Sequence, residues 1–138
     1  MTPDAIDAVF VYGTLKRGEC RASLWPFEPT DVQAASIRGD LWGREDYPAL
    51  LPGESDVLGE LWTFQEWQME RTLEVLDDIE GCRENSPSDL YHRHTVEVLM
   101  IPADSIRLAF VYQYARSPER DGFRRLACVN GYQSWPER

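Results

Sequence analysis

The segment 8–18 constrains the fold most strongly, because a short apolar run ends abruptly in a basic loop that lies between two glycines. Residues 8–12 are all apolar or aromatic, which predicts a strand buried in a sheet with the loop at its carboxyl end. The backbone N–H groups around Thr14 and Leu15 then have the arrangement needed to bind a carboxylate or a developing oxyanion. An ordinary tight loop between strands explains the same glycines equally well.

Length and charge exclude several classes of protein. The chain has 138 residues, which predicts a single domain over residues 1–138. Its net charge is −10 and Lys16 is its only lysine, so nucleic acid and anionic membrane are not expected partners. No apolar stretch approaches the roughly 20 residues of a membrane span, and the N-terminus does not resemble a secretory signal. We therefore expect a cytoplasmic protein, with its three cysteines reduced.

Strand signals dominate the rest of the chain. Alternating or continuous apolar residues predict strands over five segments: 9–12, 32–41, 57–63, 91–100 and 106–114. Proline and glycine predict turns at 46–48, 52–54 and 130–131. The segment from Ser117 onward is ambiguous, since Pro118 is compatible with the start of a short helix.

One helix is predicted, beginning after Thr63 and ending at Gly81. The Thr63 hydroxyl and Glu66 have the spacing of a capping box. The apolar stripe of this helix consists of Met69, Leu73 and Leu76, and the next position on that stripe is Glu80. The other acidic residues of the helix fall off the stripe and are expected on a solvated face: Glu70, Glu74, Asp77 and Asp78.

A carboxylate in an apolar register is the second informative feature. If the register holds, burial and the negative end of the helix dipole both raise the pKa of Glu80. A raised pKa suits a general acid or base near neutral pH. The alternative is that the last helical turn frays and Glu80 reaches water.

The motifs of this chain, in their order, resemble the gamma-glutamylcyclotransferase-like family, in its short branch related to gamma-glutamylamine cyclotransferase. The resemblance begins in segment 9–18 and covers nearly the whole chain. It continues through segments 47–50, 57–61, 76–81, 90–93 and 130–132, and ends at Trp135.

The resemblance implies an α+β fold, a small mixed β-barrel of about six strands with flanking helices. It implies an enzyme that cyclises a γ-glutamyl compound to 5-oxoproline with release of an amine, and Glu80 as the catalytic acid and base. The substrate-binding residues it implies are Tyr12, Gly13, Thr14, Leu15 and Tyr91. The partner is then a small γ-glutamyl compound, and we expect no metal and no cofactor.

Two features leave alternatives open. The same cavity would serve a binding protein that senses a small carboxylate metabolite without catalysis. The stretch 82–89 is longer than in the gamma-glutamylamine enzymes, and a loop beside the pocket can change which leaving amine fits. A nucleotide hydrolase is disfavoured because Glu19 and Cys20 replace the lysine and hydroxyl residues that a phosphate-binding loop requires.

Overall fold

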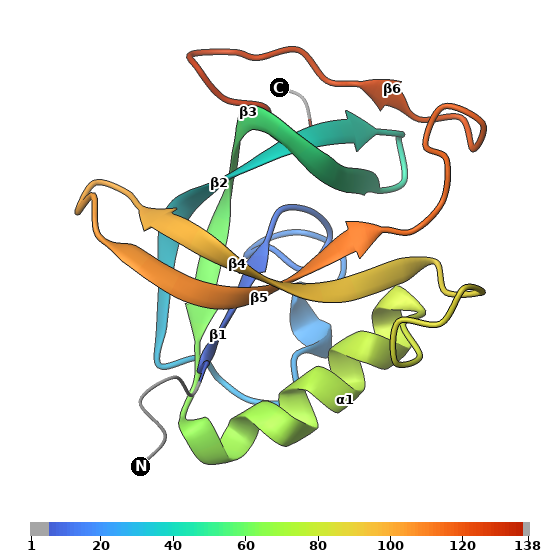
Figure 1. The fold of residues 1–138 in the computed structure, drawn as a ribbon. Coiled ribbons are helices and arrows are strands. Elements are labelled where there is room, and N and C mark those ends of the chain that lie inside the picture. Colours follow the sequence, from blue (N-terminus) through green and yellow to red (C-terminus); the bar gives the residue numbers. More distant parts are fainter. Residues whose placement is uncertain (1–5, 137–138) are drawn as a thin grey trace.

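The computed structural model describes residues 6–136 and contains a closed barrel of five strands (Figure 1). The barrel runs in the order β3, β1, β5, β4, β2, and the pairing of β2 with β3 closes it. Strand β1 pairs in parallel with β5, whereas the other barrel pairings are antiparallel, so the barrel is mixed. The predicted fold class is therefore confirmed. The barrel strands are β1 (Ala8–Val11), β2 (Asp31–Gly43), β3 (Pro48–Thr63), β4 (Tyr91–Met100) and β5 (Ile106–Tyr114).

The remaining elements lie outside the barrel. A short strand β6 (Arg124–Arg125) pairs with β2 and extends the sheet. The α-helix α1 (Met69–Glu80) lies alongside the barrel (Figure 1), and the 3-10 helices are η1 (Ala22–Leu24) and η2 (Glu66–Gln68). None of the helices within residues 6–136 has the length and apolar character needed to cross a bilayer. All three cysteines are free thiols.

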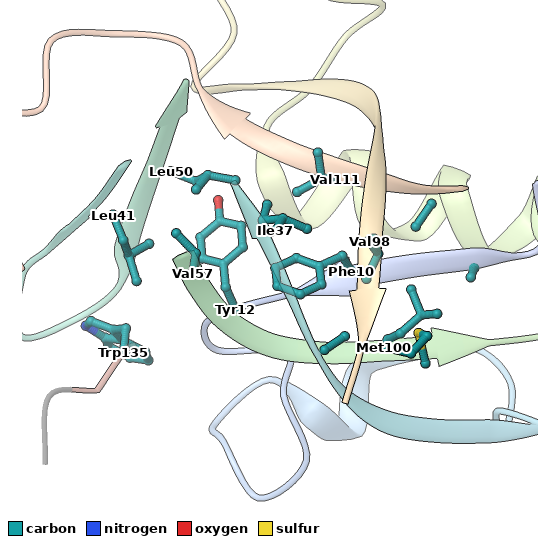
Figure 2. Packing of buried hydrophobic residues seen from close by; sticks show 14 of the residues in the cluster. Phe10, Tyr12, Ile37, Leu41, Leu50, Val57, Val98, Met100, Val111 and Trp135 are labelled. Carbon is teal, nitrogen blue, oxygen red and sulfur yellow. The ribbon is translucent and has the colours of Figure 1, made fainter. Parts of the chain in front are cut away.

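Strand β1 is buried on both faces. Phe10 and the following Tyr12 point into the barrel interior, where they pack with Ile37, Leu50 and other apolar side chains (Figure 2). Val9 and Val11 face the opposite way and belong to a second apolar cluster that includes Met69 and Leu76 of α1. The apolar run at the start of the sequence is thus enclosed by the barrel on one side and by the helix on the other, as a buried strand requires.

Strand β3 is much longer than predicted, because the turn predicted at 52–54 is a bulge within it. Gly39 of β2 pairs with Ser55, but the next residue, Asp40, pairs with Leu51, so residues 52–54 are extra on β3. A Cβ on Gly53 would lie 2.6 Å from the Cβ of Asp40, and glycine therefore permits this close approach. The continuous pairing with β2 outweighs the local turn signal. The predicted turn at 46–48 does connect β2 to β3.

The predicted end of the helix is confirmed, but its predicted cap is wrong. Thr63 is still part of β3, where it pairs with Ala8 of β1. The capping box is instead formed by Gln65 and Gln68 at the start of η2. Gly81 ends α1 in the left-handed conformation with φ 67°, as the sequence predicts.

The C-terminal segment closes one end of the barrel. Residues 118–122 form turns rather than a helix, and the predicted turn at Asn130 and Gly131 is present. Gln133 is completely buried, and its Oε1 accepts a hydrogen bond from the Leu41 N–H at 2.7 Å. Its Nε2 donates to the Leu126 carbonyl oxygen at 2.6 Å. One buried amide therefore links the C-terminal segment to β2.

Replacing Gln133 with Leu should destabilise the fold strongly. The substitution leaves the buried Leu41 N–H and Leu126 carbonyl without their partner, which predicts a loss of about 2–4 kcal/mol in the free energy of unfolding. Urea denaturation measures this loss. The matched control is Gln33→Leu at an exposed position of β2, which should change stability by less than about 0.5 kcal/mol. Equal stability of Gln133→Leu and wild type would contradict the role assigned to this amide.

Candidate active site

A cavity of about 240 Å³ opens at the carboxyl end of β1. Its buried lining comes from β1, the loop after it, and neighbouring strands: Phe10, Val11, Tyr12, Gly13, Thr14, Leu15, Pro48, Tyr91 and Tyr112. Its partly exposed lining forms the rim: Arg21, Tyr47, Ile79, Glu80 and Leu90. All six residues that the sequence and the resemblance indicate for the site therefore line one cavity.

The loop after β1 is held in place from several sides. The indole N–H of Trp25 donates to the Leu15 carbonyl oxygen at 3.0 Å, and the Trp25 ring stacks on Trp62 at a centroid distance of 4.5 Å. Gly13 is required for a close approach rather than for a special φ, since a Cβ there would lie 2.6 Å from the Cγ of Pro48. No hydrogen bond among residues 6–136 uses the N–H group of Thr14 or Leu15. These donors are therefore available to a ligand.

The basic side chains of the loop do not line the cavity. The Lys16 Nζ donates to the Trp135 carbonyl oxygen at 2.5 Å, and thus ties the loop to the C-terminal segment. Arg17 is exposed, and its backbone N–H donates to the Glu60 carboxylate at 2.8 Å. Thr14 and Leu15 of the loop line the cavity and have backbone N–H groups without a partner among residues 6–136, whereas the Lys16 and Arg17 side chains are not part of the lining.

Glu80 enters the cavity from the last turn of α1. The helix does not fray, because the Gly81 N–H bonds to carbonyl oxygens of the last turn and the Cys82 N–H donates to the Asp77 carbonyl oxygen at 2.8 Å. Burial raises the pKa of Glu80 to about 7, and the positive charge of Arg21 opposes this rise. The direction agrees with the prediction from the helix register. A carboxyl group with this pKa exchanges protons readily near neutral pH.

Two buried tyrosines stiffen the floor of the cavity. The Tyr91 hydroxyl donates to the Pro48 carbonyl oxygen at 2.6 Å, and the Tyr12 hydroxyl donates to the Tyr112 carbonyl oxygen at 2.5 Å. Burial raises the pKa of both phenols above their ordinary value, and the negative charge of Glu80 adds to this effect. Both tyrosines therefore stay protonated, as the hydrogen bonds that they donate require.

Asp77 is not on the solvated face that the helix pattern predicts. Its carboxylate pairs with Arg93 of β4 at 2.8 Å and accepts a hydrogen bond from the Tyr112 hydroxyl at 2.6 Å. These contacts attach α1 to the barrel one turn before Glu80. Arg93 thus forms a structural ion pair, while Tyr91 on the same face of the strand lines the cavity.

The stretch 82–89 packs against the start of β4 and contributes nothing to the lining of the cavity. Asp89 organises it by accepting hydrogen bonds from the backbone N–H groups of Arg83 and Ser86. Asn85 exchanges two hydrogen bonds with the backbone of Arg93. The residues on either side of this stretch, Glu80 and Leu90, do line the cavity, so the influence of the stretch on the leaving amine stays a prediction.

Sequence reasoning did not single out Arg21 or Tyr112 as site residues. Tyr112 shares a face of β5 with Tyr114, and the alternation of that strand gives a signal for its burial. No local signal distinguishes Arg21 from other arginines. Among residues 6–136 no group of three His, Cys, Asp or Glu side chains has the arrangement of a metal site.

Comparison with known proteins identifies the family of this chain. The sequence model of the family described as "Gamma-glutamyl cyclotransferase, AIG2-like" matches residues 9–135. The chain belongs to this family. It is 31% identical over 127 residues to the gamma-glutamylaminecyclotransferase of Rattus norvegicus, with 78% of this chain and 77% of the relative covered.

Solved structures share the fold of this family member. The AIG2-like protein of Mus musculus superposes with a TM-score of 0.66 at 24% identity, over 96% of this chain and 97% of the mouse protein. YkqA of Bacillus subtilis superposes with a TM-score of 0.60 at 22% identity, over 87% of this chain. This chain spans only 37% of the length of YkqA.

Replacing Glu80 with Gln should stabilise the protein at alkaline pH. A pKa of about 7 in the folded state and 4.5 as the ordinary value means that folding disfavours the charged carboxylate. Because the side chain is partly exposed, we expect a gain of about 1–2 kcal/mol at pH 8, less than the full shift would give. At pH 4 both states hold the proton and the gain should vanish.

Urea denaturation of wild type and Glu80→Gln at the two pH values measures this difference. A matched control is Glu70→Gln on the exposed side of α1, which should change the free energy of unfolding by less than about 0.5 kcal/mol. A Glu80→Gln variant that is no more stable than wild type at pH 8 would contradict the burial assigned to this carboxyl group.

Proposed function

We propose that the protein is a cyclotransferase that converts a γ-glutamyl compound to 5-oxoproline and releases the amine, with Glu80 as general acid and base. The observation that supports this most directly is that Glu80 lines the same cavity as Thr14 and Leu15, whose backbone N–H groups make no hydrogen bond within residues 6–136. The name of the rat relative, gamma-glutamylaminecyclotransferase, supports the same class of substrate.

The reaction requires proton transfer but no nucleophile from the protein. The neutral α-amine of the substrate attacks its own γ-carbonyl carbon, a new C–N bond forms, and the carbonyl oxygen becomes negative. Glu80 accepts the proton that the attacking nitrogen releases, and passes it to the leaving nitrogen. The original C–N bond then breaks as the carbonyl group re-forms, and Glu80 returns to its carboxylate form.

A pKa near 7 suits both halves of this cycle. A carboxylate with an ordinary pKa would be a weak base toward an amine, whereas a group with a much higher pKa would already hold its proton at neutral pH. Burial places Glu80 between these limits. Burial of the Glu80 carboxyl group lowers the stability of the folded protein, and the same burial gives the group the pKa that proton transfer requires.

The other residues hold the substrate and stabilise charge. The N–H groups of Thr14 and Leu15 face the developing oxyanion, where fixed donors are most effective because they need no reorganisation. Gly13 lets this loop pack tightly on Pro48. Tyr12 and Tyr91 shape the floor that encloses the glutamyl part of the substrate, and no cofactor takes part.

Glu80→Gln should abolish most of the formation of 5-oxoproline. Glutamine cannot accept the proton, so we expect kcat to fall about 10²–10⁴-fold on any γ-glutamyl compound that the wild type cyclises. A panel of γ-glutamyl amines and γ-glutamyl amino acids, with 5-oxoproline quantified by chromatography, provides the measurement. The matched control is Glu70→Gln, which should retain wild-type activity.

Two results would contradict the proposal in different ways. Undiminished turnover by Glu80→Gln would remove Glu80 from the mechanism. Tight binding of the panel to wild type by calorimetry, with no 5-oxoproline formed, would instead indicate a binding protein that senses a carboxylate metabolite.

A further inference from the structure

Arg21 places a positive charge at the rim of the cavity, near Glu80. Its backbone N–H donates to the Thr14 carbonyl oxygen at 2.7 Å, so its position is fixed relative to the loop. Within the part of the chain that the structure describes, its partly buried guanidinium group has no hydrogen bond and no ion pair. A guanidinium group that is partly removed from water and lacks a partner is well suited to bind an anion, above all a carboxylate.

The position of Arg21 distinguishes the two ends of a γ-glutamyl substrate. Thr14 and Leu15, which have N–H groups without a partner among residues 6–136, belong to the buried part of the lining, whereas Arg21 and Glu80 belong to its partly exposed part. The glutamyl half closes into a ring and belongs in the enclosed part. The leaving amine departs to solvent and must therefore cross the rim, past Arg21.

Distances within an amino acid favour the same assignment. When the leaving group is an α-amino acid, its carboxylate is one carbon atom away from the nitrogen that Glu80 protonates. Arg21 is near enough to Glu80 for its charge to act on that carboxyl group. A carboxylate on the leaving group would thus meet the guanidinium while its nitrogen meets Glu80.

We propose that Arg21 binds a carboxylate carried by the leaving amine; this inference rests on the proposed function. The enzyme then prefers γ-glutamyl amino acids over γ-glutamyl derivatives of neutral or cationic amines. A bidentate contact with the guanidinium orients the leaving group, and a cationic leaving group is repelled. None of the residues 82–89 lines the cavity, whereas Arg21 does, so we assign this selectivity to Arg21.

A matched pair of substrates tests the proposal. γ-Glutamyl-alanine and γ-glutamyl-alaninamide have the same shape, but only the first has a carboxylate on its leaving amine. The KM of the wild type for γ-glutamyl-alanine should be at least about tenfold lower than its KM for γ-glutamyl-alaninamide. Arg21→Gln should raise KM for γ-glutamyl-alanine about tenfold relative to KM for the alaninamide. Any change in kcat that follows from losing the Arg21 charge near Glu80 should be the same for the two compounds. Arg21→Lys should retain part of the preference, since it keeps the charge.

The control variant is Arg17→Gln, at an exposed position of the same loop that does not line the cavity, and it should keep the wild-type preference. Thermal melting verifies that each variant is folded. Equal KM values of wild type for the two compounds, or an equal effect of Arg21→Gln on both, would overturn the proposal; the second result would assign Arg21 to the glutamyl carboxylate that both substrates share.

Binding to the Glu80→Gln background separates this proposal from the proposed function. Calorimetry with the two compounds needs no turnover. Suppose that γ-glutamyl-alanine binds more tightly than the alaninamide, that Arg21→Gln removes this difference, and that the wild type forms no 5-oxoproline. That result would support the carboxylate site at Arg21 and contradict cyclisation. Cyclisation of both compounds with no preference would contradict the role of Arg21 alone. Neither binding nor cyclisation would contradict both.

Discussion

Strand β1 has no face in contact with water, because Phe10 points into the barrel while Val9 and Val11 pack beneath α1. The apolar cluster that covers the outer face of the strand includes Met69 and Leu76 of α1, which holds the helix along the barrel wall. The last turn of the helix is thereby brought to the loop that follows β1. Packing of the apolar strand thus places Glu80 in the lining of the same cavity as Thr14, and the site is a consequence of how the core is closed.

The site combines groups whose charges are poorly solvated. Burial raises the pKa of Glu80 and Arg21 lowers it, so the proton affinity of the carboxyl group depends on both. The surrounding tyrosines contribute neutral donors whose hydrogen bonds are already made within the protein. Asp77 and Arg93 fix the helix one turn earlier through a bidentate contact, so Glu80 is held in place without being neutralised by a partner of its own.

Residue type and spacing along the chain were sufficient to predict the features that short segments determine by themselves. The apolar strand at the start of the chain, the alternating strands, the end of the helix at Gly81 and the inward register of Glu80 all follow from residue type and spacing. The length of β3 did not follow, because its pairing with β2 overrides the turn signal of Gly53. Gln133 and Arg21 gave no signal either, since their environments exist only after distant segments have closed the barrel and the cavity.

The proposed chemistry depends on a carboxyl group that is held partly away from water in the cavity lined by Thr14 and Leu15. The most direct measurement is a carbon-13 NMR titration of the Glu80 side-chain carboxyl in the unliganded protein, with the resonance assigned by its loss in a Glu80→Gln sample. The account predicts a midpoint near pH 7. A midpoint near the ordinary value of 4.5 would contradict it, because the carboxyl group would then be fully solvated and a weak base toward an amine.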